Sequence, residues 1–288
     1  MTYRCAIEKG IQYSAPNGHR LRLTLYRPQT TDAQPRTGIV LIHGGAWIAG
    51  SRLLQRWYGR QFARAGMVAA AVDYRKMPRY PFPACLHDAK AAVRWLRARA
   101  GQYAVDSNRI VAMGESAGGH LALMLAATRP EDGLEGEENP GPGSSVQAAV
   151  SLYGPSDLRY YVRTRNLKLF GPIAPRFMRS FVGADPDGAV ELLGRASPFH
   201  YIHAGMCPVL LIHGTRDSLV PFDQTAAFQQ RMRELGGTAE LVAMKNRGHA
   251  FDYIHPRMRP LVLETVLGFL DQHGLASAKR EECRRGRI

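Results

Sequence analysis

Short apolar runs alternate along the chain with longer segments in which apolar residues recur at helical spacing. The apolar runs have the length and composition of strands, and they cover residues 38–44, 67–73, 109–114, 146–154, 208–214 and 239–245. Segments with helical spacing follow most of these runs. This alternation is typical of an α/β fold in which the strands form a mostly parallel sheet.

The helical segments carry recognisable start and stop signals. Ser51 is a suitable N-cap for a helix that runs to about Ala65, where Gly66 stops it. Further helices are expected at residues 84–100, 116–127, 222–237 and 259–272. Near the N-terminus, two alternating segments at residues 4–13 and 19–26 flank the turn-rich sequence SAPNG, which predicts an antiparallel hairpin.

Two stretches interrupt the alternation of strands and helices. Residues 129–145 are polar and rich in Gly and Pro, which predicts a mobile surface loop. Residues from about 157 to 197 contain prolines and several aromatic residues, and we interpret them as a lid-like insertion. The chain of 288 residues is long enough to bury one large core, so a single domain over residues 1–288 is the expectation.

The sequence GESAG at residues 114–118 follows a predicted strand and opens a predicted helix. Small residues are required two positions before and two positions after Ser116, because the chain turns so sharply from strand to helix that larger side chains there would clash. Such a turn exposes the serine hydroxyl at the top of the sheet, and the N-terminal end of the helix favours negative charge beside it. Ser116 is therefore the candidate nucleophile, and a chance glycine-rich helix cap is the alternative.

A serine hydroxyl is a weak nucleophile at neutral pH and needs a base whose orientation is fixed by a carboxylate. His249 and Asp217 are the candidates, since each lies just beyond a predicted strand. The carboxyl ends of parallel strands meet at one edge of the sheet, where Ser116 is also expected. The chain order Ser, Asp, His is the order found in folds that carry this strand-to-helix turn. Asp157 is the rival carboxylate, and His213 at the end of a strand is interpreted as structural.

A third motif, HGGAW at residues 43–47, follows the first buried strand. Glycines at this position let backbone N–H groups approach a substrate oxygen closely. Gly44 and Gly45, together with the N–H of Ala117, are therefore predicted to bind the oxyanion of a tetrahedral intermediate. The alternative is a turn that simply tolerates glycine. Trp47 either lines the substrate pocket or packs in the core.

The composition adds no further chemistry. The formal charge is +14, but the basic residues are scattered without interleaved aromatic residues, so no nucleic-acid partner is expected. No apolar run approaches the ~20 residues of a membrane span, and no secretory signal is recognisable, which favours a cytoplasmic location unless a leader has been removed. The four cysteines are scattered without a CxxC pair, so free and mostly buried thiols, no metal site and no cofactor are expected.

Several motifs, spread over almost the whole chain, together resemble a known family. They are similar to those of the hormone-sensitive-lipase-like carboxylesterases, and more closely of the acetyl and feruloyl xylan esterase branch. The motifs that carry the resemblance are HGGAW, AVDYR, FPA, GESAGGHLA, SLYGPSDL and HGTRDSLVPF. Isoprenylcysteine methylesterases and kynurenine formamidases look similar around HGGAW.

The resemblance implies an α/β-hydrolase fold, with helices on both faces of a mostly parallel sheet, an N-terminal antiparallel hairpin and a small lid insertion. It implies a catalytic triad and an oxyanion hole at the residues named above. Enzymes of the hormone-sensitive-lipase type usually carry a helical cap ahead of HGG, but the 42 residues before His43 are predicted as strands. Any cover is then expected from residues 157–197. The candidate substrate-binding residues are Trp47, Glu115, Tyr160 and Phe170.

The predicted function is that of a serine carboxylesterase. Its expected substrates are small-molecule esters with short acyl groups, from acetyl to butyryl, or with aryl groups, which react through an acyl-enzyme. An amide hydrolase such as an arylformamidase uses the same triad and is the alternative. A non-catalytic binding protein on a hydrolase scaffold is less favoured, because such proteins usually lack the nucleophile or the base. The sequence leaves open the alcohol half of the substrate and the oligomeric state, for which a homodimer is one option.

Overall fold

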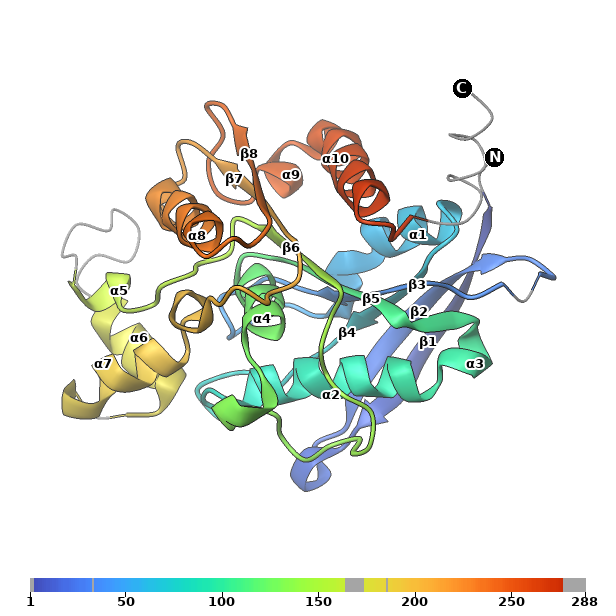
Figure 1. The fold of residues 1–288 in the computed structure, drawn as a ribbon. Helices are drawn as coiled ribbons and strands as arrows, with labels where there is room; N and C mark the ends of the chain where they lie inside the picture. The colour runs from blue at the N-terminus through green and yellow to red at the C-terminus, as the bar shows by residue number, and fades with distance from the viewer. Residues whose placement is uncertain (1–2, 33, 164–173, 185, 277–288) are drawn as a thin grey trace.

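The structure is a computed structural model that describes residues 3–32, 34–163, 174–184 and 186–276 of the chain. In these ranges eight strands form one sheet in the order β1-β2-β4-β3-β5-β6-β7-β8 (Figure 1). The strands are β1 (Arg4–Ser14), β2 (Leu21–Gln29), β3 (Arg36–Ile42), β4 (Val68–Val72), β5 (Val105–Glu115), β6 (Ala148–Leu152), β7 (Val209–Gly214) and β8 (Ala239–Met244). The predicted N-terminal hairpin is β1 and β2, and β2 also pairs antiparallel with β4. The remaining neighbours are parallel, as predicted.

Helices lie on both faces of this sheet (Figure 1). They are α1 (Arg56–Arg64), α2 (Ala84–Ala98), α3 (Ala100–Tyr103), α4 (Ala117–Ala127), α5 (Tyr160–Arg163), α6 (Ala174–Val182), α7 (Pro186–Arg195), α8 (Phe222–Glu234), α9 (Phe251–Ile254) and α10 (Arg259–Gln272). The helix predicted from Ser51 begins with a 3₁₀ segment, Arg52–Gln55, and continues as α1. The Ser51 hydroxyl caps this segment by accepting from the N–H of Leu53 at 3.4 Å.

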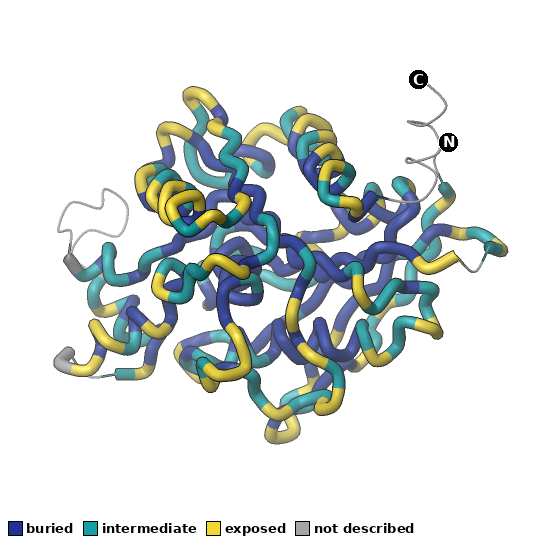
Figure 2. The backbone as a smooth tube through the Cα atoms, viewed as in Figure 1, coloured by how far each residue is buried: buried dark blue, intermediate teal, exposed yellow. Residues whose placement is uncertain are grey.

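The central strands are buried on both sides, which explains their continuous apolar runs. Val40 and Ile42 of β3 pack in one cluster with residues of α2 and α4, whereas Ile39 and Leu41 pack in a second cluster with residues of α1 and α10. Alternate residues of the strand thus point to opposite faces. In Figure 2 the central strands are dark blue and the edge strand β1 is mostly teal, and the exposed positions lie on loops and on the outer sides of the helices.

The described residues of the lid-like insertion, 157–163, 174–184 and 186–197, include three α-helices between β6 and β7. These helices, α5, α6 and α7, lie together at one end of the molecule, at the left in Figure 1. They contact one another, and Met178 and Phe181 of α6 belong to the same buried cluster as residues of α2 and α4. The insertion is therefore packed against the main body.

The polar loop at residues 129–145 is fastened at several points. Glu135 forms ion pairs with Lys90 and Arg94 of α2, the second at 3.1 Å, and accepts a hydrogen bond from Ser144 at 2.6 Å. Glu138 accepts from the hydroxyl of Ser14 at 2.7 Å. These contacts speak against the predicted mobile loop. The physical reason is that the carboxylate of Glu135 pairs with both Lys90 and Arg94, whose side chains are buried on α2.

Candidate active site

Ser116 lies at the sharp turn between β5 and α4. Its φ is 52° and its ψ is −118°, a conformation that residues with a side chain rarely adopt. A Cβ atom on Gly118 would lie 2.0 Å from the carbonyl oxygen of Ile42, so the approach of the helix to β3 requires glycine there. The N–H of Ser116 donates to the carbonyl of Leu152 at 2.8 Å and ties the turn to the end of β6. The predicted arrangement of strand, turn and helix is present.

The side chains of Ser116, His249 and Asp217 meet at the carboxyl edge of the sheet. The Nε2 atom of His249 lies 2.9 Å from Ser116 Oγ, and its Nδ1 atom lies 2.7 Å from Asp217 Oδ2. Because a carboxylate only accepts hydrogen bonds, Nδ1 is assigned the proton, and Nε2 is left to accept from the serine hydroxyl. This is the geometry of a nucleophile, a base and an orienting acid.

The carboxylate of Asp217 is buried and fully hydrogen-bonded. Its Oδ1 atom accepts from the N–H groups of Leu219 and Val220, each at 2.9 Å. Burial by itself would raise the pKa of Asp217, but hydrogen bonds from His213 and His249 outweigh burial and hold the pKa well below its usual range. The acid is therefore ionised at neutral pH, as the orientation of His249 requires.

His213 is a partner of Asp217 that the sequence interpretation missed. Its Nε2 atom lies 3.1 Å from Asp217 Oδ2 and 2.9 Å from the carbonyl oxygen of Val220, both acceptors, so Nε2 carries the proton. The hydroxyl of Thr225 is 2.6 Å from Nδ1 and donates to it. A signal was present in the sequence, because His213 ends a strand only four residues before the candidate acid.

The rival carboxylate lies elsewhere. Asp157 forms an ion pair with Arg159 at 3.0 Å and lies 3.4 Å from the hydroxyl of Ser197. The structure thus brings Asp217, and not Asp157, to the imidazole of His249.

The predicted oxyanion loop touches the nucleophile. A Cβ atom on Gly44 would lie 3.4 Å from the Cβ atom of Ser116, and Gly45 follows with a φ of +120°. Ala117 is the first residue of α4, and the first N–H groups of a helix have no partner within the helix. Gly44 and Ala117 therefore adjoin Ser116, with Gly45 next along the loop.

A small apolar cavity of about 30 Å³ opens beside Ser116. Its walls come from the oxyanion loop, the turn after β6, the insertion and the loop after β7: Ala46, Trp47, Ser116, Ala117, Pro155, Tyr161, Phe177, Met178, Leu219 and Val220. Trp47 lines the cavity and also packs on Phe181 with ring centroids 4.4 Å apart, and its role as a substrate contact stays a prediction. The volume is similar to that of one water molecule in the liquid, which leaves little enclosed space.

Two of the candidate substrate-binding residues are placed differently from the expectation. Glu115 faces the interior, where it accepts hydrogen bonds from Gln55 and from Tyr253, the latter at 3.2 Å. Burial, followed by the nearby charge of Asp252, raises the pKa of Glu115 to about 8. Glu115 is buried and does not line the cavity, so we withdraw it as a substrate contact. Tyr161 lines the cavity in place of Tyr160.

The remaining predictions concern residues outside this cavity. Phe170 lies outside the described residues. Of the cysteines, Cys5, Cys85 and Cys207 are free thiols; Cys85 is buried and the other two are partly exposed, and Cys283 is not described. Among the described residues, no group of three His, Cys, Asp or Glu side chains is placed to hold a metal ion. In the same ranges, no helix is both long enough and apolar enough to cross a membrane.

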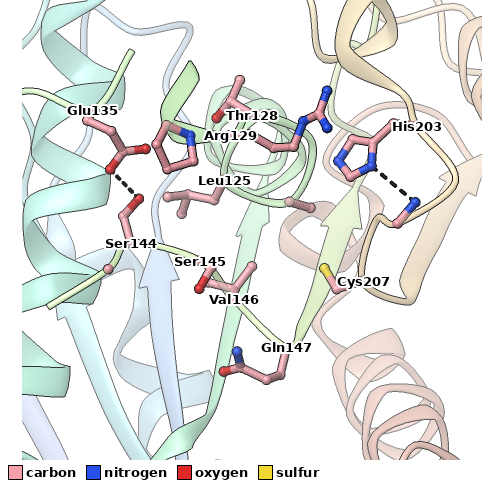
Figure 3. A pocket seen from close by; sticks show the side chains of 14 residues that line it. Leu125, Thr128, Arg129, Glu135, Ser144, Ser145, Val146, Gln147, His203 and Cys207 are labelled. Atoms are coloured by element: carbon pink, nitrogen blue, oxygen red, sulfur yellow. Dashed lines mark hydrogen bonds between the residues drawn. The ribbon is translucent and has the colours of Figure 1, made fainter. Parts of the chain in front are cut away.

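A larger cavity of about 500 Å³ lies away from the triad (Figure 3). It adjoins the C-terminal end of α4 and the segments that precede β6 and β7, where Val146 and Cys207 lie. Figure 3 shows two hydrogen bonds between the lining residues: Ser144 donates to Glu135 at 2.6 Å, and the N–H of Gly205 donates to Nδ1 of His203 at 3.1 Å. Ligands of open α/β sheets bind at the carboxyl ends of the strands, so we assign the active site to the smaller cavity at Ser116.

The geometry agrees with a comparison of the sequence with known families. The sequence model of the BD-FAE family matches residues 23–232. The chain belongs to the BD-FAE family. The match runs from the N-terminal hairpin to α8, and it includes the oxyanion loop, Ser116 and Asp217, whereas His249 lies beyond it.

Individual relatives of this BD-FAE chain are esterases. It is 29% identical over 252 residues to the esterase LipC of Mycobacterium tuberculosis. The aligned residues cover 87% of this chain and 62% of LipC. It is 28% identical over 246 residues to the isoprenylcysteine alpha-carbonyl methylesterase ICME of Arabidopsis thaliana, which covers 83% of this chain and 56% of ICME. The chain thus spans less than two thirds of the length of these curated relatives.

The same likeness extends to solved structures. The esterase Est2 of Thermogutta terrifontis superposes with a TM-score of 0.79 at 30% identity, over 94% of each chain. The α/β-hydrolase fold and the resemblance to hormone-sensitive-lipase-like and feruloyl esterases are thereby confirmed. The relatives support the predicted class, the carboxylic-ester hydrolases.

Proposed function

We propose that this chain is a serine carboxylesterase that hydrolyses short-chain esters through an acyl-enzyme. The observation that carries the proposal is the continuous hydrogen-bonded series from Ser116 Oγ to His249 and on to Asp217, at 2.9 and 2.7 Å. Both distances are within hydrogen-bond reach, which proton transfer from a nucleophile to its base requires. The relatives LipC, ICME and Est2, which are named as esterases, support the same chemistry.

In the first half-reaction, Ser116 Oγ attacks the carbonyl carbon of the ester while its proton passes to Nε2 of His249. Asp217 stabilises the imidazolium that forms. The carbonyl oxygen becomes an anion, which the N–H groups of Gly44, Gly45 and Ala117 are proposed to bind. Collapse of the tetrahedral intermediate breaks the bond to the alcohol, and His249 returns the proton to the departing oxygen.

In the second half-reaction, water takes the place of the alcohol. His249 accepts a proton from the water, whose oxygen attacks the acyl carbon, and the second intermediate collapses to release the acid and the serine hydroxyl. The positive end of α4 lies at Ser116 and favours the negative charge in both intermediates.

The cavity beside Ser116 supports a preference for short acyl groups. At about 30 Å³ it has room to enclose only a few atoms, and its lining is mostly apolar. Solved structures of the Thermogutta terrifontis esterase carry propionate and butyrate, which are short-chain acids. We therefore propose acetyl to butyryl or aryl esters as substrates, with Trp47 and Tyr161 among the residues that contact the acyl group.

The organisation of the chain is part of the proposal. We propose that residues 1–288 form a single domain and that α5 and α6 cover the acyl cavity, since Tyr161 of α5 and Phe177 and Met178 of α6 line it. A cytoplasmic location and a homodimer stay predictions. Fractionation of cells that express the tagged chain tests the first, and sedimentation of the purified chain tests the second.

The decisive experiment combines labelling with kinetics. A fluorophosphonate probe is expected to label the wild-type chain and not Ser116→Ala, and Ser116→Ala should hydrolyse p-nitrophenyl acetate at near-background rates while remaining folded by circular dichroism. If Ser116→Ala keeps more than a few per cent of the wild-type rate, the assignment is wrong. Faster turnover of N-formylkynurenine than of aryl acetates would favour an arylformamidase, and binding without turnover would favour a non-catalytic protein.

A further inference from the structure

A carboxylate outside the triad is buried close to the proposed base. Asp252 lies in α9, three residues after His249, and none of its surface is exposed. Removing a carboxylate from water costs several kcal/mol unless hydrogen bonds replace the lost hydration. The groups that donate hydrogen bonds to Asp252 therefore indicate which segments its carboxylate holds together.

Two tyrosine hydroxyls bind the two carboxylate oxygens of Asp252. Tyr58 of α1 donates to Oδ2 at 2.9 Å, and Tyr153, directly after β6, donates to Oδ1. Hydrogen bonds to an ionised acceptor are about twice as strong as those between neutral groups. Arg259 also donates from Nε to the backbone carbonyl of Asp252 at 3.1 Å. The short helix after His249 is thus fastened to α1, to α10 and to the end of β6.

Tyr153 also contacts the imidazole. Its ring centroid lies 4.8 Å from that of His249, with the planes at 66°, and Phe251 packs on Tyr153 at 5.4 Å. The φ of Tyr153 is +42°, and its N–H donates to the carbonyl of Ile212 at 2.8 Å. For a bulky buried residue this conformation is strained, and such strain persists where the surrounding structure enforces it, as at functional sites.

Asp252 does not compete with Asp217 as the orienting acid. Nδ1 of His249 is bound by Asp217 and Nε2 by Ser116, so neither ring nitrogen is left for another partner. Any effect of Asp252 on the reaction must therefore pass through the position of the imidazole.

We propose that Tyr58, Tyr153 and Asp252 form a positioning clamp that holds His249 at hydrogen-bond distance from Ser116. This proposal rests on the proposed esterase function, because the position of His249 is measured through the rate of ester hydrolysis. A displacement of about 1 Å costs about 10²-fold in rate. None of the three residues lines the acyl cavity, so the clamp acts on kcat and leaves KM nearly unchanged.

Three conservative variants test the clamp. Asp252→Asn is expected to lower kcat about 10- to 100-fold on p-nitrophenyl acetate, with KM changed by less than about twofold. Tyr153→Phe should have a larger effect than Tyr58→Phe, because each removes one hydroxyl from Asp252 but the hydroxyl of Tyr153 also anchors the ring that packs on the imidazole. Tyr201→Phe is the control, since its hydroxyl donates to the carbonyl of Arg195, and its kcat should stay at the wild-type value.

A double-mutant cycle separates positioning from a general structural role. If Asp252 acts through His249, Asp252→Asn should leave the residual rate of His249→Ala unchanged. An equal loss in both backgrounds, or full kcat in folded Asp252→Asn, would overturn the proposal. If Asp252→Asn does not fold, the ratio of kcat between Tyr153→Phe and Tyr58→Phe decides, and equal values reject the clamp. Absence of esterase activity in the wild-type chain would instead contradict the proposed function.

Discussion

His213 donates a 3.1 Å hydrogen bond to Asp217, on the carboxylate oxygen that also receives His249. The imidazole of His213 is itself fixed by the hydroxyl of Thr225 from α8. The acid of the proposed triad is therefore held from two sides, by a buried histidine at the end of β7 and by the backbone N–H groups of the loop that follows. We expect the orientation of His249 to depend on these hydrogen bonds from His213, Leu219 and Val220 to Asp217.

We expect His213→Ala to lower kcat by about 10- to 100-fold, which is the effect seen when the partner that orients a metal-binding side chain is removed. Thr225→Val should cost less, because it removes the donor to Nδ1 but leaves the bond from Nε2 to Asp217. Steady-state kinetics with p-nitrophenyl acetate measures both. The exposed His200→Ala serves as a matched control and should retain wild-type kinetics. Unchanged kcat in His213→Ala would mean that the backbone donors suffice.

Asp217→Asn should lower kcat by about 10⁴, because an amide in place of the carboxylate stabilises the wrong tautomer of His249. The fold should survive, since the amide has nearly the same shape. Asp157→Asn is the comparison: its carboxylate binds Arg159 and not the imidazole, so a loss of less than about tenfold is expected. A larger defect in Asp157→Asn than in Asp217→Asn would show that the acid is wrongly chosen.

Acyl length should be limited by the cavity beside Ser116. We expect kcat/KM to be highest for aryl acetate to butyrate esters and to fall beyond roughly six to eight carbons, where further methylenes lie outside the cavity and gain none of the ~0.8 kcal/mol that burial provides. A p-nitrophenyl ester series measures this. A maximum at decanoate or longer, or activation at an oil–water interface, would indicate a lipase.

The wall of the cavity offers a matched pair of variants for this series. Met178 of α6 lines the cavity, whereas Leu193 of α7 is equally buried but does not. Met178→Ala should therefore move the optimum toward longer acyl groups, and Leu193→Ala should leave it in place while lowering stability by about 2–5 kcal/mol. The same shift in both variants would mean that a general loosening of the insertion, and not the cavity wall, sets the acyl length.

The buried Glu115 makes stability depend on pH. Its pKa in the folded chain is raised by burial from 4.5 to about 8, so between these values the folded chain keeps a proton that the unfolded chain releases. The free energy of unfolding contributed by this group therefore falls as pH rises through that window, by up to about 1.4 kcal/mol per pH unit. Glu115→Gln removes the titration. From pH 5 to 8, the free energy of unfolding of the wild type, measured with denaturant, should fall relative to that of Glu115→Gln. Parallel curves of this free energy against pH would contradict the prediction.

The order of elements and the candidate nucleophile were readable from the sequence, because both depend on local patterns. The apolar runs predicted the strands at β3 to β8, and the hairpin signal predicted β1 and β2. The GESAG turn needed only its flanking strand and helix to identify Ser116. Asp217 and His249 followed from their places after two parallel strands, and the structure brings them to Ser116; their catalytic roles stay predictions.

Other features were not readable, because they depend on contacts between distant segments. The polar composition of residues 129–145 suggested a loose loop, but its carboxylates meet Lys90 and Arg94 across the fold. Glu115 adjoins the nucleophile in sequence, yet the pleat of β5 directs it into the interior. Nothing in the pattern around residue 252 indicated that its carboxylate joins tyrosines from α1 and β6.

By itself, the sequence determined which residues are the candidates for catalysis and at which edge of the sheet they lie. Strand and helix periodicity, the turn at Ser116 and the chain order of the triad are properties of neighbouring residues, and parallel strands bring their carboxyl ends together. The tertiary structure alone decided how the base is held and how small the acyl cavity is. The physical reason is that positions within a few tenths of an ångström come from packing and buried hydrogen bonds between segments far apart in the chain, which no local pattern encodes.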